Sequence, residues 1–220
     1  MSCQSPRLST RSRTLLCCTL LLLCQTLHAQ NTLTLDTDGV PVLLAAYLAP
    51  QRELFPATTE DTSVGGVHAI VYTPSTGIAA ENQDKVLINL HGGGFSGCWL
   101  GCAELESRPI AELGRIKVVS LDIGAAYLAG TDPNDPLVAP ANHPAVLAQF
   151  PPTLILSGTR SYDLSNAVHT HLALAKQHVP AELYVWEGMF HGFFYNPDVP
   201  ESQECLDFIV RFFNQWLGRD

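Results

Sequence analysis

The feature that most constrains the fold of this chain is a run of three glycines directly behind a short apolar segment. Residues 85–90 read Lys-Val-Leu-Ile-Asn-Leu, and His91-Gly92-Gly93-Gly94-Phe95 follows at once. A short, nearly continuous apolar run is typical of a strand buried on both faces, as in a parallel sheet. Successive glycines let backbone N–H groups turn toward one point without hindrance from side chains. Such donors can hold a developing oxyanion, so residues 91–94 are predicted to form an oxyanion loop rather than an ordinary glycine-rich turn.

Further apolar runs alternate with segments of helical spacing, which predicts an α/β fold with a mainly parallel sheet. In chain order we expect strands at 67–72 and 85–90, a helix at about 103–113, strands at 116–121 and 153–156, a helix at 164–177, a strand at 183–186 and a helix at 204–217, with loop at 124–152. The spacing places in the core Ala167, Leu172, Leu174 and Ala175 on the second helix, and Leu206, Ile209, Val210, Phe213 and Leu217 on the third.

The first 29 residues differ in character from the rest. Three arginines precede the apolar run 15–23, and Leu27-His28-Ala29 offers a cleavage site before Gln30. This is the pattern of a secretory signal peptide, and the run is shorter than the ~20 residues that a bilayer span needs. We therefore expect a signal peptide at 1–29, an N-terminal extension or cap-like segment at 30–63, and the main domain at 64–220. The mature chain would be exported, periplasmic or secreted, without a stable membrane anchor.

Removing this leader changes the charge and the cysteine count. It carries three of the 12 Lys+Arg and none of the 21 Asp+Glu, so the mature chain has a net charge of −12. Such a surface repels nucleic acid and anionic membranes. The remaining cysteines are Cys98, Cys102 and Cys205. Cys98 and Cys102 are close enough in sequence to pair, and the sequence is compatible both with a disulfide and with two buried free thiols. No metal site is expected, because no second group of Cys or His at ligand spacing accompanies them.

Four segments of the chain carry a resemblance to a known family. The segment from Leu90 to Phe95 resembles the hormone-sensitive-lipase-like branch of the α/β-hydrolases, which includes bacterial esterases and acetyl hydrolases. Residues 106–122, 135–140 and 150–158 are similar to segments of that branch, and the similarity spans about residues 64–218. The resemblance implies an α/β-hydrolase fold, a small-molecule ester substrate or ligand, and no cofactor.

The same resemblance points to a base and an acid. His191, in Glu187-Gly-Met-Phe-His191, takes the position of the general base, and an imidazole with a pKa near ~6.5 suits that role at neutral pH. The alternative is a capping or core histidine. Many relatives carry aspartate where Ser161 stands, so the acid is assigned to Asp163, the nearest carboxylate. Its alternative role is to cap the helix that begins near Leu164.

One part of the family pattern is missing. Relatives place a Gly-x-Ser-x-Gly turn between the strand that ends near Asp122 and the loop at Asp135, and no serine of this chain has that setting. Ser96, in Gly94-Phe-Ser96-Gly-Cys98, comes nearest. About a dozen residues separate the two segments, whereas each strand–helix–strand crossover needs at least ~10–12. The chain is therefore predicted to be internally truncated, to lack the central nucleophile strand, and to expose apolar faces on both sides of the gap unless something covers them.

Three interpretations of the function follow. The chain is a carboxylic-ester hydrolase-like protein of impaired or no activity, which could still bind acyl or ester ligands without catalysis. Alternatively it is an active hydrolase with an unusual nucleophile, Ser96 or Cys98, although no basic residue flanks Cys98 to lower its pKa. In the third interpretation a partner chain supplies the nucleophile segment. The sequence leaves ester chain length and homo-oligomer formation open.

Overall fold

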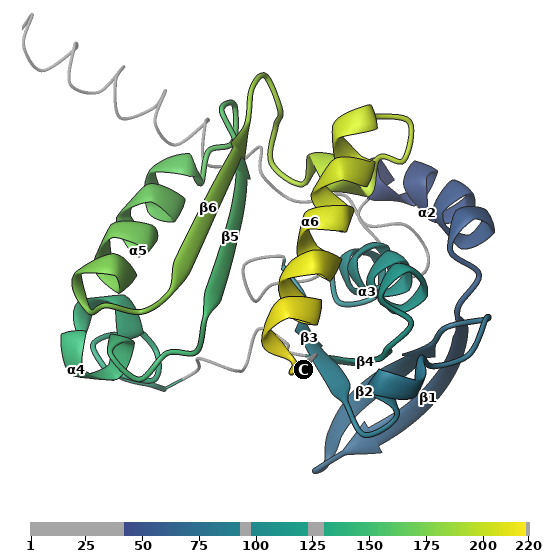
Figure 1. The fold of residues 1–220 in the computed structure, drawn as a ribbon, viewed down its shortest axis with the longest axis horizontal. Coiled ribbons are helices and arrows are strands. Elements are labelled where there is room, and N and C mark those ends of the chain that lie inside the picture. Colours follow the sequence, from purple (N-terminus) through teal and green to yellow (C-terminus); the bar gives the residue numbers. More distant parts are fainter. Residues whose placement is uncertain (1–41, 93–97, 123–129, 219–220) are drawn as a thin grey trace, which may run out of the picture. The chain divides into compact units, whose positions relative to one another are not determined.

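The computed structural model describes residues 42–92, 98–122 and 130–218 of the chain. All of them belong to one compact unit, Leu35–Asp220. The elements, shown in Figure 1, are α2 (Val42–Leu54), β1 (Thr58–Val64), β2 (Val67–Thr73), η1 (Ala80–Asn82), β3 (Val86–Leu90), α3 (Gly101–Gly114), β4 (Lys117–Leu121), η2 (Pro140–Asn142), α4 (Pro144–Leu147), β5 (Thr153–Gly158), α5 (Leu164–Lys176), β6 (Ala181–Trp186), η3 (Phe193–Tyr195) and α6 (Pro200–Trp216). The signal peptide expected at 1–29 lies outside the described residues. Within the described ranges, every helix is too short or too polar to cross a bilayer.

The strands form two separate sheets. The first has the order β1-β2-β4-β3, with β1–β2 and β2–β4 antiparallel and β3–β4 parallel. The second consists of β5 and β6, which run parallel. Helices flank both sheets, so the expected α/β class is confirmed, with a mixed rather than a mainly parallel set of pairings. Along the chain, the first sheet ends with β4 and the second begins with β5, and the central strand is predicted to be missing between these two strands.

Two elements near the N-terminus were not predicted from the sequence. Helix α2 contains Pro50, and β1 reads Thr-Thr-Glu-Asp-Thr-Ser-Val with mostly exposed side chains. The proline in α2 and the polar side chains of β1 weaken the sequence patterns by which a helix and a half-buried strand are recognised. Because β1 pairs along its whole length with β2, the sheet begins ahead of the domain start expected at residue 64.

The expectation that residues 85–90 and 116–121 form strands buried on both faces holds for only one of them. Strand β4 lies between β2 and β3, and its Val118 and Ser120 are buried. Strand β3 is an edge strand among the described strands, and Ile88 and Leu90 are 63% and 61% exposed. A strand is buried only where neighbouring strands and covering helices surround it. Apolar side chains of β3 are therefore exposed on one face, while exposure on both sides of the expected gap stays a prediction.

The core positions expected on α6 are mostly confirmed. Leu206 and Ile209 are buried, while Val210, Phe213 and Leu217 are half-buried. On α5, Leu174 is buried, but Leu172 and Ala175 are exposed, so those two predictions are wrong. Helix α5 packs against the two-stranded β5–β6 sheet, mainly through Leu174 and its neighbours, and this narrow sheet covers only one stripe of the helix.

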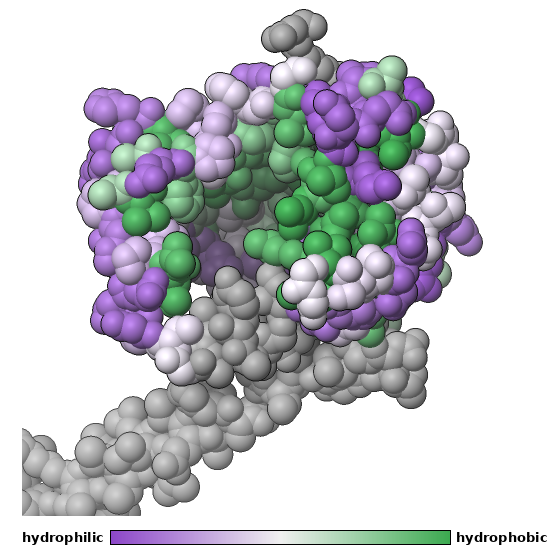
Figure 2. All heavy atoms as spheres, turned by 90° about the horizontal axis from the view of Figure 1, so that it is seen from below, coloured by the Kyte–Doolittle hydropathy of each residue, from purple (hydrophilic) through white to green (hydrophobic). Residues whose placement is uncertain are grey.

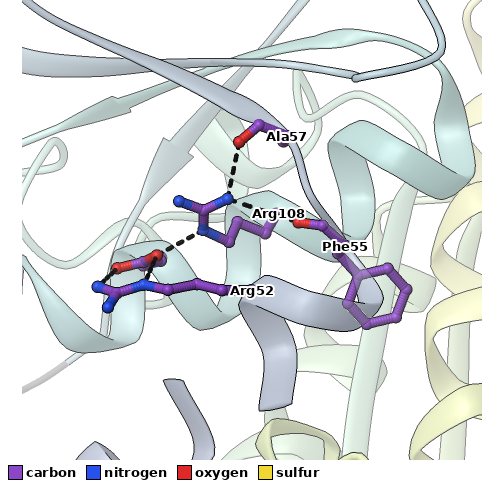
Figure 3. A network of polar contacts seen from close by, with 5 residues as sticks. Arg52, Phe55, Ala57 and Arg108 are labelled. Carbon is purple, nitrogen blue, oxygen red and sulfur yellow. Dashed lines mark hydrogen bonds and ion pairs between the residues drawn. The ribbon is translucent and has the colours of Figure 1, made fainter. Parts of the chain in front are cut away.

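A partly buried ionic network ties α2 to α3 and to the segment before β1 (Figure 3). Arg52 on α2 donates two hydrogen bonds of 2.7 Å to the carboxylate of Glu104 on α3, and Arg108 also donates to that carboxylate. Arg108 further donates to the carbonyl oxygens of Phe55 and Ala57. Burial alone would raise the pKa of Glu104, but the hydrogen bonds and positive charges of the two arginines hold it below its usual value of 4.5.

Of the three cysteines outside the leader, two are paired with each other and one is free. Cys98 and Cys102 form a disulfide, which settles the alternative that the sequence left open in favour of the bond. It joins the end of the glycine-rich segment to the first turn of α3. Cys205 on α6 is free and buried, and burial raises the pKa of its thiol to about 12. A thiol in that state is not reactive near neutral pH.

Candidate active site

His191 lies in the loop between β6 and η3, at the carboxyl end of the two-stranded sheet. This loop approaches the end of β5 so closely that a Cβ at Gly158 would lie 2.1 Å from the carbonyl oxygen of Met189. The Arg160 N–H donates to the same carbonyl at 2.9 Å. Gly192, which follows the histidine, has a φ of +69°, a conformation that favours glycine. The close contact and the positive φ fix the path of the loop, which holds His191 beside the turn after β5.

Two oxygen atoms approach the same nitrogen of His191. The Asp163 carboxylate and the Ser161 hydroxyl each lie 3.4 Å from Nδ1. The ring of Tyr162 stacks on the imidazole, with ring centroids 4.3 Å apart. An oxygen acceptor at Nδ1 favours the tautomer with its proton on Nδ1, which leaves Nε2 as the proton acceptor. The residues expected as acid and base therefore lie within ion-pair distance of each other, while their catalytic roles stay a prediction.

The alternative role of Asp163, as a helix cap, is not what its side chain does. Asp163 occupies the N-cap position of α5, but its side chain makes no capping hydrogen bond. Its carboxylate instead faces His191 and accepts a hydrogen bond from the Asn166 side chain at 3.3 Å. The Ser161 hydroxyl accepts a hydrogen bond from the Asp163 N–H, and so fixes the turn that carries the carboxylate.

The expected oxyanion segment begins at the carboxyl end of β3. His91 and Gly92 are described, while Gly93, Gly94 and the alternative nucleophile Ser96 lie outside the described residues. The His91 ring pairs with the Gly92 carbonyl, with 2.7 Å between Nδ1 and the oxygen. Gly92 and His191 line one cavity of about 370 Å³. The start of the expected oxyanion segment, which follows β3 of the first sheet, therefore lines the same cavity as Asp163 and His191, which follow the strands of the second sheet.

A buried carboxyl group, Glu106 on α3, lies between these two parts of the site. The Tyr195 hydroxyl donates to Glu106 Oε1 at 2.6 Å, and both residues line the cavity. Burial raises the pKa of Glu106, while hydrogen bonds from Tyr195, Asn89 and the Gly92 N–H partly oppose the shift. Burial and the Glu106 charge likewise raise the pKa of Tyr195. The pair links the loop after His191 to the segment that carries Gly92.

Sequence reasoning assigned no role to Glu106 or Tyr195. The spacing did contain a signal: Ala103, Glu106 and Ile110 recur at three and four, so the carboxyl group lies on the apolar face of α3. A carboxylate in such a position calls for a hydrogen-bond partner, because a buried charge without one is costly. The partner, Tyr195, is distant in sequence and could not be identified from spacing alone.

The described residues offer few groups that could act as a nucleophile. Cys98 forms a disulfide and so lacks the free thiolate that the second interpretation requires. Ser157 and Ser161 line the cavity, but the Ser161 hydroxyl lies at Nδ1 of His191, on the side of the acid. Within 42–92, 98–122 and 130–218, no three Cys, His, Asp or Glu side chains are grouped as metal ligands. The described part of the site thus contains the expected base His191, the expected acid Asp163 and the first two residues of the expected oxyanion segment.

Comparisons with known proteins agree with this geometry. A family model described as the alpha/beta hydrolase fold matches residues 120–195, which span β5, β6 and His191. An acetyl-hydrolase from Streptomyces hygroscopicus is 33% identical over 204 residues, covering 83% of this chain and 68% of that protein.

Solved structures show the same fold at lower identity. Esterase E25 superposes with a TM-score of 0.65 at 21% identity, covering 84% of this chain and 88% of that one. An esterase from the bacterial hormone-sensitive lipase family superposes with a TM-score of 0.66 at 17% identity, covering 80% of this chain and 91% of that one. The described fold is therefore the one seen in these esterases.

Proposed function

Since the chain belongs to the α/β-hydrolase family and is esterase-like, we propose that it binds carboxylic esters at the His191 cavity but has impaired or no hydrolytic turnover. The observation that carries the proposal is the position of Ser161. Its hydroxyl lies at Nδ1 of His191 together with the Asp163 carboxylate, so the described serine nearest to the base is on the wrong side of the ring.

The retained groups favour binding over chemistry. Acyl transfer needs a hydroxyl or thiolate beside the nitrogen that takes up its proton, and a pair of donors for the oxyanion. In the proposed role, the cavity receives the ester group between Gly92 and His191, and Nε2 accepts a hydrogen bond from water or from a ligand hydroxyl. Direct attack by water lacks the covalent intermediate that divides the reaction into two easier steps. Turnover of activated esters would therefore stay close to the buffer rate.

A fluorophosphonate probe tests whether the chain has a working serine nucleophile, which the proposal denies. The chain from Gln30 is purified, its folding is checked by circular dichroism, and its intact mass is measured after labelling. We expect no added mass. Phosphonylation of one serine in the wild type, lost in His191→Ala but kept in the matched surface variant His169→Ala, would contradict the proposal. Peptide mapping would then show whether Ser96 is the nucleophile, as in the second interpretation.

Binding is measured separately from turnover. Equilibrium dialysis with methyl butyrate should show saturable retention by the wild type, and His191→Ala and Asp163→Asn should weaken it more than His169→Ala does. Absence of retention by a folded wild-type chain would contradict the binding half of the proposal.

We also propose that the chain is exported and that its leader is removed near Ala29. The Cys98–Cys102 disulfide supports this, because such bonds persist in oxidising compartments. Expression of the full chain in a bacterium, followed by fractionation and N-terminal sequencing, should yield a periplasmic or secreted species that starts near Gln30. A cytoplasmic species with an intact leader would contradict it.

A further inference from the structure

Tyr195 is held by several contacts just after the loop of His191. Its N–H donates to the Gly192 carbonyl at 3.0 Å, and its ring packs so closely that a Cβ at Gly192 would lie 2.9 Å from it. The side chain of Gln51 on α2 donates to the Tyr195 carbonyl oxygen at 3.2 Å. The Tyr195 hydroxyl donates to Glu106 Oε1 at 2.6 Å. Because Gly192 directly follows His191, these contacts connect Glu106 to the loop that carries the expected base.

Glu106 also contacts the other part of the candidate site. The Asn89 side chain and the Gly92 N–H both donate hydrogen bonds to its carboxyl group. Gly92 is the first glycine of the expected oxyanion segment, and it lines the same cavity as Glu106 and His191. One carboxyl group on α3 therefore accepts hydrogen bonds from the start of this segment and from Tyr195, which follows the His191 loop.

The surroundings of Glu106 make these partners important. The residue also borders a second cavity, of about 390 Å³, with mainly apolar walls, and Figure 2 shows apolar side chains around a hollow of one face of the molecule. Among the described residues that line this second cavity, Glu106 is the single titratable one. Burial raises the pKa of Glu106, because apolar surroundings disfavour the charged form. A carboxyl group in such a place is costly without donors, so its hydrogen bonds fix its orientation.

We propose that Glu106 is a positioning residue of the candidate site, which holds the His191 loop through Tyr195 and the start of the oxyanion segment through Gly92. The inference rests on the proposed function and adds to it how the ester-binding cavity keeps its two walls in register. When the connection is broken, the arrangement that binds the ester is populated only in part, and the apparent affinity falls by that fraction. A pair that only stabilises the fold would leave the surroundings of His191 and Gly92 unchanged.

The first test reads each variant at the far end of the connection, without ligand. The imidazole signals of His191 are measured in Glu106→Gln, and the amide signal of Gly92 is measured in Tyr195→Phe, by nuclear magnetic resonance with labelled histidine and glycine. We expect both signals to shift from their wild-type positions. A signal that keeps its wild-type position in either folded variant would overturn the proposal.

Tyr184→Phe is the matched control for this test. The Tyr184 hydroxyl donates to Glu182 at 2.9 Å, so the variant removes the same kind of hydrogen bond from a tyrosine that does not line the cavity. We expect neither the His191 nor the Gly92 signal to move, and circular dichroism checks that every variant is folded. Shifts as large as those in the Tyr195 variant would mean that the signals respond to any such loss, and would overturn the proposal.

The second test measures the Kd of methyl butyrate by equilibrium dialysis. Tyr195→Phe should raise the Kd about tenfold, the change that corresponds to a lost hydrogen bond of roughly 1.4 kcal/mol, while Tyr184→Phe leaves it unchanged. Equal Kd values for the wild type and Tyr195→Phe would overturn the inference and leave the proposed function standing. Absence of binding by the wild type would contradict the proposed function, and the signals without ligand would then decide the inference.

A double variant tests whether the two residues act through one connection. Glu106→Gln keeps an oxygen that can accept from the Tyr195 hydroxyl, so it should bind more tightly than Glu106→Leu. In Glu106→Leu the bond is already lost, so adding Tyr195→Phe should not raise the Kd further. Additive losses would mean that the two residues act independently and would overturn the proposal. Tyr195→Phe keeps the ring that packs against Gly192, so its own result decides the proposal even where Glu106→Leu does not fold.

Discussion

Strands β4 and β3 are neighbours with similar sequences and opposite environments. Residues 116–121 and 85–90 both read as short apolar runs, and the two strands pair in parallel along their whole length. Yet Val118 of β4 is 1% exposed, whereas Ile88 of β3, on the opposite face of the sheet, is 63% exposed, and its register partner Val119 on that face is half-buried. Strand β4 has partners on both edges and packs against α3, while β3 has a described partner on one edge only.

The burial of an apolar side chain in a strand therefore depends on the strands and helices around it, and not on the sequence of that strand alone. An apolar run predicts what a segment can bury, and the rest of the chain decides whether it does. On the β4 side, the Glu104 network, α3 and the antiparallel strands complete the surroundings. On the β3 side, no further strand pairs with β3 among the described residues, and the apolar side chains on one of its faces are exposed. Mutations should therefore have large effects on the first side and small effects on the second.

The largest effect is expected at Glu104. Replacing it with alanine leaves Arg108 half-buried without its carboxylate, and breaking a buried pair in this way costs about 3–5 kcal/mol. Urea unfolding followed by circular dichroism gives the free energy of unfolding. The control is Glu112→Ala on the same helix, whose carboxylate accepts exposed hydrogen bonds from Ser75 and should cost less than about 1 kcal/mol. Equal losses in the two variants would mean that the network does not anchor this side.

The second effect compares the two strands directly. Val118→Ala removes buried methyl groups and should destabilise the chain by about 2 kcal/mol, because the cavity left behind cannot fully collapse. Ile88→Ala removes more atoms from an exposed site and should change stability by less than about 0.5 kcal/mol. Both values come from the same urea experiment. Equal losses of stability in the two variants would show that β3 is covered in solution and would contradict the expected difference between the two strands.

The third effect is the pH dependence of the Glu104 network. The pKa of Glu104 is lowered in the folded chain, so the unfolded chain takes up more protons in acid. Its stabilisation is present above the usual value of 4.5 and is lost as the pH falls below it. Melting temperatures of the wild type and Glu104→Gln, measured between pH 7 and pH 3, should differ most at neutral pH and converge in acid. A constant difference across that range would contradict the assignment.

The sequence predicted the elements that carry a clear apolar period and missed those that do not. The strands at β2, β3, β4, β5 and β6 and the helices α3, α5 and α6 were all expected, with ends displaced by a few residues. Helix α2 and strand β1 were missed, because α2 contains Pro50 and β1 is polar except for Val64. The core of α5 was placed on Leu172 and Ala175, because periodicity does not reveal how narrow the covering sheet is.

The candidate site likewise contains residues that the sequence predicted and residues that it did not predict. His191 and Asp163 were chosen from local sequence, and the structure brings them together at 3.4 Å. The contribution of Ser161 at the same nitrogen was not expected, because it depends on how the turn after β5 folds back. Glu106 and Tyr195 are 89 residues apart, and no local pattern joins them. Pairs of this kind depend on the packing of the whole domain and lie beyond what spacing can predict.

The smallest change in stability is expected for Ile88→Lys. This variant also tests most directly whether the apolar side chains of β3 are exposed. The side chain is 63% exposed, so a lysine can extend into water and stability should stay within about 0.5 kcal/mol of the wild type. The fluorescence of a hydrophobic dye should fall, because one of the apolar side chains that face the gap is gone. The matched control is Val64→Lys on β1, an exposed apolar residue on the far edge of the same sheet. If dye binding falls equally in both variants, the dye reports general surface hydrophobicity; if it falls only in Ile88→Lys, the uncovered edge of β3 is the apolar surface that the missing strand leaves behind.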